Sequence, residues 1–260
     1  MTSQNTIFWN VDTQHDFMRP DGKLYVKGAE AIEPNLERLT QYARTNGIYV
    51  VNTADWHTPE SEELSATPDY KTTFPPHCMA DTKGAEFVPA TSSSGYAIHW
   101  RAKEVSAKLF DNPHDITILK DDFDVFKGNP HTEEILGIVA PDRAIVYGVA
   151  TNVCVDYAVK GLRKRGIETY VVFDAIKELP DIPVQPVYDS WRKSDVGFVV
   201  TEDVPKLLGH EPGMPRYVIT TPYPTTEQVA KTLGASDEEV REAIAIVERS
   251  IGATKQRRRR

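Results

Sequence analysis

The chain has 260 residues, of which 40% are hydrophobic and 26% charged, and its formal net charge is -8. This composition is typical of a globular protein with one α/β domain and a small appendage, and the acidic balance argues against a general nucleic-acid-binding protein. The sequence shows no signal-peptide pattern, no apolar stretch long enough to cross a bilayer, and only two cysteines, Cys78 and Cys154. We therefore expect a cytoplasmic protein with free thiols and no membrane partner.

Short apolar runs predict six strands, over residues 7–11, 48–53, 115–119, 144–149, 168–173 and 196–201. Between the first two runs, Ile32, Leu36 and Leu39 recur at helix spacing, and after the fourth run Val155, Val159 and Leu162 do the same before Gly166. Strands that alternate with helices predict an α/β protein with a three-layer Rossmann-like fold and a mainly parallel six-stranded sheet.

The connection between the second and third strands, residues 52–115, is too long for an ordinary crossover, which indicates a functional role. Its later part, residues 102–110, is predicted to form a helix.

After residue 204 prolines become frequent, and two helices are predicted, over residues 226–233 and 236–251, the second opened by a capping box of Ser236 and Glu239. We expect a main domain over residues 1–204 and a helical appendage over residues 205–260 that docks on the domain or on a neighbouring subunit. The basic run Arg257–Arg260 is interpreted as a disordered tail or a remnant of expression.

Reactive side chains follow four of the predicted strands: Asp12, the segment 53–55, Lys120 and the turn 149–154. Ligands of parallel sheets bind beyond the carboxyl ends of the strands, so these segments are expected to converge at one edge.

Cys154 lies where a strand turns into a helix, and the free N–H groups of a helix N-terminus favour a thiolate and can bind an oxyanion. Asp12 could accept the thiol proton and later deliver it to a leaving amine. Lys120 would favour the charged forms of both groups. Each of the three residues, taken singly, could instead have a structural role, as a packing cysteine, a turn aspartate and a surface lysine.

The sequence also contains a candidate metal site in Asp55, His57 and His77. The Asp-x-His spacing places two ligands on the same side of an extended segment, and mixed N and O donors suit zinc, iron or manganese. Glu63 could be a fourth ligand, with Glu62 as its rival. The remaining histidines are expected to be exposed and without a role: His15, His99, His114, His131 and His210.

Three motifs together resemble the isochorismatase-like cysteine hydrolase superfamily, and within it the nicotinamidases. The first is Val-Asp-Thr-Gln-His-Asp-Phe at residues 11–17, followed by Gly-Lys-Leu-Tyr-Val-Lys-Gly at 22–28. The second runs from Asp-Trp-His at 55–57 through Thr-Pro-Asp-Tyr at 67–70 to Phe-Pro-Pro-His-Cys at 74–78. The third is Gly-Val-Ala-Thr-Asn-Val-Cys-Val at 148–155. The resemblance covers residues 6–202, which makes residues 1–204 the expected hydrolase domain.

The resemblance implies a catalytic triad of Asp12, Lys120 and Cys154, and a cis peptide between Val149 and Ala150. It also implies an oxyanion hole made by the N–H groups of Ala150 and Cys154. One divalent metal ion would be held by Asp55, His57 and His77, with Glu63 where some relatives carry a third histidine. The substrate would be bound by Phe17, Leu24, Phe74 and Val149.

The activity implied by the resemblance is hydrolysis of nicotinamide to nicotinate and ammonia through a cysteine thioester, a reaction of NAD salvage. Homo-oligomerisation is implied as well. Phe74 and Val153 differ from residues frequent at their positions, so hydrolysis of another small amide, carbamoyl or ureido compound is a second hypothesis. A third is a non-catalytic binding module, which the occupied triad positions disfavour.

Overall fold

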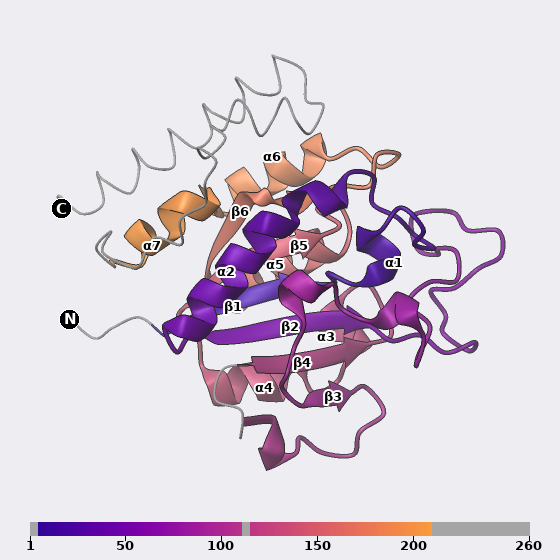
Figure 1. Cartoon of the computed structure of the whole chain (residues 1–260), viewed down its shortest axis with the longest axis horizontal. Coiled ribbons are helices and arrows are strands. Elements are labelled where there is room, and N and C mark those ends of the chain that lie inside the picture. The colour runs from indigo at the N-terminus through magenta and orange to yellow at the C-terminus, as the bar shows by residue number, and fades with distance from the viewer. Residues whose placement is uncertain (1–4, 111–114, 210–260) are drawn as a thin grey trace.

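The computed structural model describes residues 5–110 and 115–209, and its centre is a parallel sheet (Figure 1). In the described part of the chain the sheet has seven strands in the order β3-β4-β2-β1-β5-β6-β7. Their bounds are β1 Thr6–Val11, β2 Tyr49–Asp55, β3 Ala97–His99, β4 Asp115–Lys120, β5 Arg143–Val149, β6 Glu168–Lys177 and β7 Gly197–Val199.

Helices cover both faces of the sheet. The crossover from β1 to β2 runs in one direction along the sheet, whereas those from β4 to β5, β5 to β6 and β6 to β7 run in the other. Because parallel crossovers are right-handed, α2 covers one face and α3, α4, α5 and α6 the opposite face. Figure 1 shows α2 lying across the front of the sheet. The helices are α1 His15–Met18, α2 Glu33–Thr45, α3 Val125–Gly128, α4 Thr132–Val139, α5 Cys154–Lys164, α6 Gln185–Lys193 and α7 Val204–Leu207.

Five short 3-10 helices lie in the connections of the described chain: η1 Ala29–Ile32, η2 Lys83–Ala85, η3 Pro89–Thr91, η4 Ala107–Phe110 and η5 Thr201–Asp203. No helix among residues 5–110 and 115–209 is long and apolar enough to span a membrane.

The sequence pattern explains the layers. Strand β1 is buried along almost its whole length and is apolar except for Thr6 and Asn10, as is typical of a central parallel strand covered on both faces. Helix α2 buries Leu36 and Leu39 against the sheet, and α5 buries Val155, Val159 and Leu162, which is the helix spacing seen in the sequence.

The predicted fold class is confirmed, with differences in the long connection. A further strand, β3, lies there; it has three residues and is held by its pairing with β4 rather than by an apolar run of its own. The helix predicted over residues 102–110 is wrong, because only its last turn, η4, is helical. Helix α7 begins at Val204, the predicted boundary, whereas the predicted helices 226–233 and 236–251 lie outside the described residues.

The strand order brings the reactive segments together. Strands β4, β2, β1 and β5 are consecutive neighbours, and their carboxyl ends carry Lys120, Asp55, Asp12 and Val149. The long segment after β2 folds back over this edge, where it forms isolated bridges from His57 to Met79 and from Gln14 to Phe87.

Gly148 allows two of these strand ends to approach each other. Its φ is +120°, and a Cβ built there would lie 2.1 Å from the carbonyl oxygen of Val11, the residue before Asp12. A side chain at this position therefore meets both an unfavourable backbone conformation and a backbone contact that cannot move aside. Gly148 keeps the turn that carries Cys154 close to Asp12.

Gly148→Ala is expected to lower the free energy of unfolding by at least about 2 kcal/mol, because strain and steric overlap add. Gly137→Ala is the matched control, since a Cβ at that α4 position meets nothing within 4 Å and should raise stability by about 0.5–1 kcal/mol. Urea unfolding of both variants measures the two effects. Equal stabilities of the two variants would contradict this explanation of Gly148.

Candidate active site

Asp12, Lys120 and Cys154 meet in one buried cluster at the carboxyl edge of the sheet. Lys120 Nζ lies 3.0 Å from Asp12 Oδ2 and 3.9 Å from Cys154 Sγ. The Cys154 sulfur lies within 4.8 Å of a carboxylate oxygen of both Asp12 and Asp55. Thr53, on the neighbouring strand β2, donates its hydroxyl to Asp12 Oδ1 at 2.6 Å and so fixes the orientation of that carboxylate.

Lys120 also forms an ion pair and hydrogen bond with Asp55 Oδ1. One ammonium group thus contacts the carboxylates of both Asp12 and Asp55, and all three side chains are essentially excluded from solvent. Burial alone would lower the pKa of Lys120, but the two carboxylates and Cys154 raise it well above its ordinary value. Lys120 is therefore a permanent cation at this position.

Burial raises the pKa of the Cys154 thiol well above its ordinary value, and Asp12 and Asp55 add to the rise that Lys120 opposes. The rise opposes the preference for a thiolate that a helix N-terminus provides, so removal of the thiol proton needs a nearby base. Burial also raises the pKa of Asp12, against the opposing effect of Lys120. A carboxylate of raised pKa is a stronger base, which suits it to remove the thiol proton.

The turn between β5 and α5 presents two backbone N–H groups beside the sulfur. The Val149–Ala150 peptide is cis. Within the described chain, the N–H groups of Ala150 and Cys154 have no hydrogen-bond acceptor, whereas that of Thr151 donates to the Lys177 carbonyl. Asn152 anchors the turn, since its Oδ1 accepts from Leu179 N–H at 3.0 Å and its Nδ2 donates to the Leu179 carbonyl at 2.8 Å.

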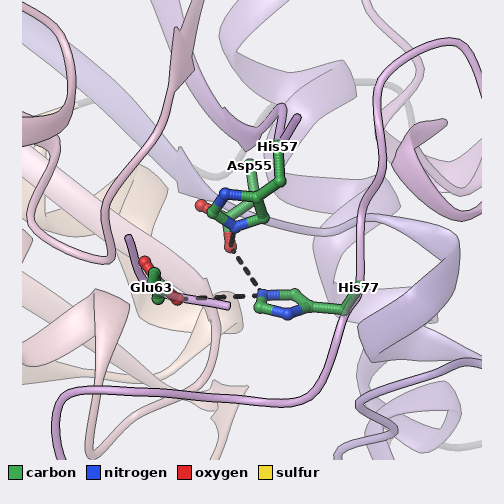
Figure 2. Close-up of side chains that lie close together, drawn as sticks. All are labelled: Asp55, His57, Glu63 and His77. Atoms are coloured by element: carbon green, nitrogen blue, oxygen red, sulfur yellow. Dashed lines mark ion pairs between the residues drawn. The ribbon is translucent and has the colours of Figure 1, made fainter. Parts of the chain in front are cut away.

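A second cluster lies directly beside the first and is formed by Asp55, His57, Glu63 and His77 (Figure 2). All four side chains are buried, and one potential ligand atom from each lies within 4.8 Å of the others. His77 Nε2 is 3.4 Å from Asp55 Oδ2 and 3.8 Å from Glu63 Oε1, and His57 Nε2 is 3.8 Å from the same Asp55 oxygen. Figure 2 shows the His77 ring reaching toward both carboxylates.

The residues of this cluster fit a divalent metal ion. In the described structure Asp55 Oδ2, His57 Nε2 and Glu63 Oε2 are buried without a hydrogen-bond partner, which is costly for polar atoms unless another ligand satisfies them. Two imidazoles and two carboxylates are a donor set for zinc, iron or manganese.

The electrostatics of the cluster also favour a cation. Burial would lower the pKa of His57, but the hydrogen bond to Asp121 and the nearby carboxylate of Asp55 raise it to about 10. Burial, with the charge of Asp55, raises the pKa of Glu63 to about 8. For Asp55 itself, burial is outweighed by Lys120 and the two histidines, which hold its pKa well below the usual range. The cluster therefore attracts positive charge, whether protons or a metal ion.

Aromatic rings lie against the histidines. The ring centroid of Phe17 is 5.2 Å from that of His77, and the centroid of Phe74 is 6.4 Å from it. Both phenylalanines are buried, as are Val149 and, at 9% exposed, Leu24. Leu24 donates its N–H to the carbonyl of Asp16, next to Phe17. The predicted substrate-binding residues Phe17 and Phe74 thus flank the metal-ligand cluster.

The remaining candidates are distinguished by burial. Glu63 is buried in the cluster, whereas its rival Glu62 is exposed. The expectation that the other histidines are exposed is wrong for His15, His99 and His131, which are half-buried, although none belongs to the cluster. His114 and His210 lie outside the described residues.

Sequence reasoning missed several residues that hold the site in place. The Gln14 amide forms a pair of hydrogen bonds with the backbone of Asp55, both of 2.7 Å. Asp16 Oδ2 accepts from the N–H of Cys78 at 2.8 Å and so holds the loop that carries His77. Asp121 accepts from His57. The first motif contains Gln14 and Asp16, but long-range partners cannot be read from a local pattern.

The chain is similar to a known protein family and to several curated proteins. The model of the isochorismatase domain matches residues 6–185. The nicotinamidase/pyrazinamidase of Mycobacterium tuberculosis is 29% identical over 173 residues, which cover 63% of this chain and 82% of that protein. The nicotinamidase of Saccharomyces cerevisiae is 26% identical over 202 residues, 66% of this chain and 88% of the yeast protein.

Solved structures share the fold. The pyrazinamidase of Pyrococcus horikoshii in complex with zinc is 24% identical, with a TM-score of 0.59 over 75% of this chain and 99% of its own. An isochorismatase family protein from Desulfovibrio vulgaris is 19% identical, with a TM-score of 0.62 over 80% of this chain and 100% of its own. At these identities the likeness concerns the fold alone.

Lys120→Met is expected to lower the free energy of unfolding by about 3–5 kcal/mol, because it leaves buried carboxylates without their cation. Cys154→Ala removes a neutral thiol and should change stability by less than about 1.5 kcal/mol. Denaturant unfolding of the metal-free proteins measures both. A Lys120→Met protein as stable as wild type would show that the ammonium group is not needed to balance the buried charge.

Proposed function

Because the chain belongs to the isochorismatase family, we propose that it is a metal-dependent cysteine amidohydrolase that converts nicotinamide and water to nicotinate and ammonia. The observation that carries this proposal is the buried meeting of Asp12, Lys120 and the Cys154 thiol beside a four-residue metal-ligand cluster. The relatives with sequence similarity are nicotinamidases, which supports the choice of substrate.

In the first half of the reaction, Asp12 removes the thiol proton as the Cys154 sulfur attacks the carboxamide carbon. Lys120, 3.9 Å from the sulfur, stabilises the developing thiolate. The carbonyl oxygen becomes an oxyanion, which the N–H groups of Ala150 and Cys154 bind. Asp12 then gives its proton to the amide nitrogen, the C–N bond breaks, and ammonia leaves a thioester on Cys154.

In the second half, Asp12 takes a proton from a water molecule that attacks the thioester carbon. The same two N–H groups bind the second oxyanion. The carbon–sulfur bond then breaks, the sulfur recovers the proton from Asp12, and the carboxylic acid is released. The residue that begins each half as a base ends it as an acid, so the enzyme returns to its starting protonation state.

Asp55, His57, Glu63 and His77 would hold the metal ion. When bound, a divalent ion supplies a Lewis-acidic positive charge that can take the ring nitrogen of a pyridine as a further ligand. Phe17 and Phe74, whose rings both lie near His77, provide apolar surfaces for a flat ring. We expect Val149 and Leu24, both buried, to add apolar contacts to the same ring. The cytoplasmic location and self-association remain predictions.

Cys154→Ala is expected to lower ammonia release from nicotinamide by at least about 10³-fold, because no other group can form the thioester. Cys78→Ala makes the same change at the second thiol, which is buried outside the triad and donates to the Gly84 carbonyl. That control should keep turnover within about threefold of wild type per folded molecule. A Cys154→Ala enzyme with near wild-type turnover would refute the mechanism.

Substrate choice is tested with nicotinamide, benzamide and an N-carbamoyl amino acid. The metal-loaded enzyme should prefer nicotinamide to benzamide by at least about 100-fold in kcat/KM, because benzamide lacks the ring nitrogen. A chelator should abolish this preference, and zinc, iron or manganese should restore it.

Faster ammonia release from the carbamoyl compound than from nicotinamide would contradict nicotinamide as the substrate. It would remain consistent with the cysteine mechanism. Full nicotinamide turnover by verified metal-free enzyme would contradict the metal dependence and leave the thiol mechanism intact.

A further inference from the structure

Asp121 directly follows Lys120 at the end of β4, but its side chain serves a different group. Its Oδ1 lies 3.2 Å from His57 Nδ1 and also accepts a short hydrogen bond from the Ser61 hydroxyl. We propose that Asp121 is a positioning residue that sets metal affinity by holding the segments that carry two of the ligands, His57 and Glu63. This inference rests on the proposed metal site.

The contact with His57 determines which ring nitrogen faces the cluster. With Nδ1–H donated to Asp121, Nε2 is turned toward Asp55, at 3.8 Å, and is buried without a hydrogen-bond partner in the described structure. A carboxylate on the far nitrogen of a ligating imidazole fixes the ring and increases its basicity. His77 has a weaker partner, because its Nδ1 lies 2.7 Å from the backbone carbonyl of Pro75.

The contact with Ser61 reaches the second ligand. Ser61 lies two residues before Glu63, and its hydroxyl also accepts from Thr58 N–H at 2.9 Å, so the Asp121 bond fixes a tight turn. The Glu63 carboxylate has little support of its own: Oε2 has no hydrogen-bond partner in the described chain, and Oε1 is 3.8 Å from His77. The position of Glu63 therefore depends on its backbone, which the bond between Ser61 and Asp121 ties to the end of β4.

Asp121 is not itself one of the clustered ligands, and its side chain is 21% exposed. Its neighbour Asp122 carries the same charge but faces elsewhere, with Oδ2 paired to Lys127 and Oδ1 accepting from Asp124 N–H at 2.9 Å. Substitution of Asp122 therefore removes an equal charge from the same segment without touching either ligand. This makes it a matched control for Asp121.

The test measures zinc affinity of the metal-free full-length protein in competition with a chromophoric chelator. Asp121→Ala is expected to weaken zinc binding by about 10–100-fold. Asp121→Asn keeps an oxygen acceptor without the charge and should recover part of this loss. Ser61→Ala should weaken binding several-fold, and Asp122→Asn should stay within about twofold of wild type. His57→Ala provides the reference for loss of a ligand.

The outcomes separate this inference from the proposed function. If His57→Ala weakens binding but Asp121→Ala stays within twofold of wild type, Asp121 has no positioning role and the metal site stands. If wild type and His57→Ala bind zinc equally weakly, the metal site itself is wrong. Unfolding midpoints of the metal-free variants identify a purely structural role, which would lower the midpoint and leave zinc affinity unchanged. If Asp121→Ala does not fold, unchanged affinity in both Asp121→Asn and Ser61→Ala overturns the proposal.

Discussion

The contact of the Lys120 ammonium group with two buried carboxylates is the interaction on which the rest of the site depends. Three side chains, Asp12, Asp55 and Lys120, carry charge in a region excluded from solvent, where an unpaired charge is strongly destabilising. Asp55 uses Oδ1 for Lys120 and leaves Oδ2 facing the histidines. The Asp55 carboxylate therefore belongs to both clusters, and a change of charge in one cluster alters the electrostatic potential in the other.

The sheet makes this arrangement possible at little cost in local structure. Three adjacent parallel strands place Lys120, Asp55 and Asp12 at the same edge, and the turn after the fourth strand, β5, brings Cys154 there. Groups separated by up to 142 positions, from Asp12 to Cys154, therefore meet at one edge of the sheet. The close approach of β1 and β5 requires a glycine at 148. Asp12, Asp55 and Lys120 thus lie at rigid strand ends. Glu63 and His77 come from the long loop after β2, which needs hydrogen bonds to other segments to hold it in place.

The sequence predicted well those features that depend on neighbouring residues. The apolar runs predicted six of the seven described strands, and the positions of Asp12, Lys120 and Cys154 after them led to one edge of the sheet. What failed depends on tertiary context. Strand β3 is held by β4 rather than by its own pattern, and the pKa of the Cys154 thiol is set by burial and nearby carboxylates more than by the helix N-terminus. Nothing in the local sequence singles out Asp121, because its partners, His57 and Ser61, are about sixty positions away.

Lys120 and Asp121, at the end of one strand, each contact a different one of the two clusters. Lys120 contacts Asp12, Asp55 and Cys154. The next side chain, Asp121, points another way and contacts His57 and the turn before Glu63. A shift of β4 would therefore move the lysine beside Cys154 together with the segments that carry His57 and Glu63. Catalysis by positioning needs the reacting carbon and the sulfur within a fraction of an ångström of a fixed geometry. In the proposed reaction, a substrate ring held at the metal ion would stay in register with Cys154, because Lys120 and Asp121 support the two sides of the site.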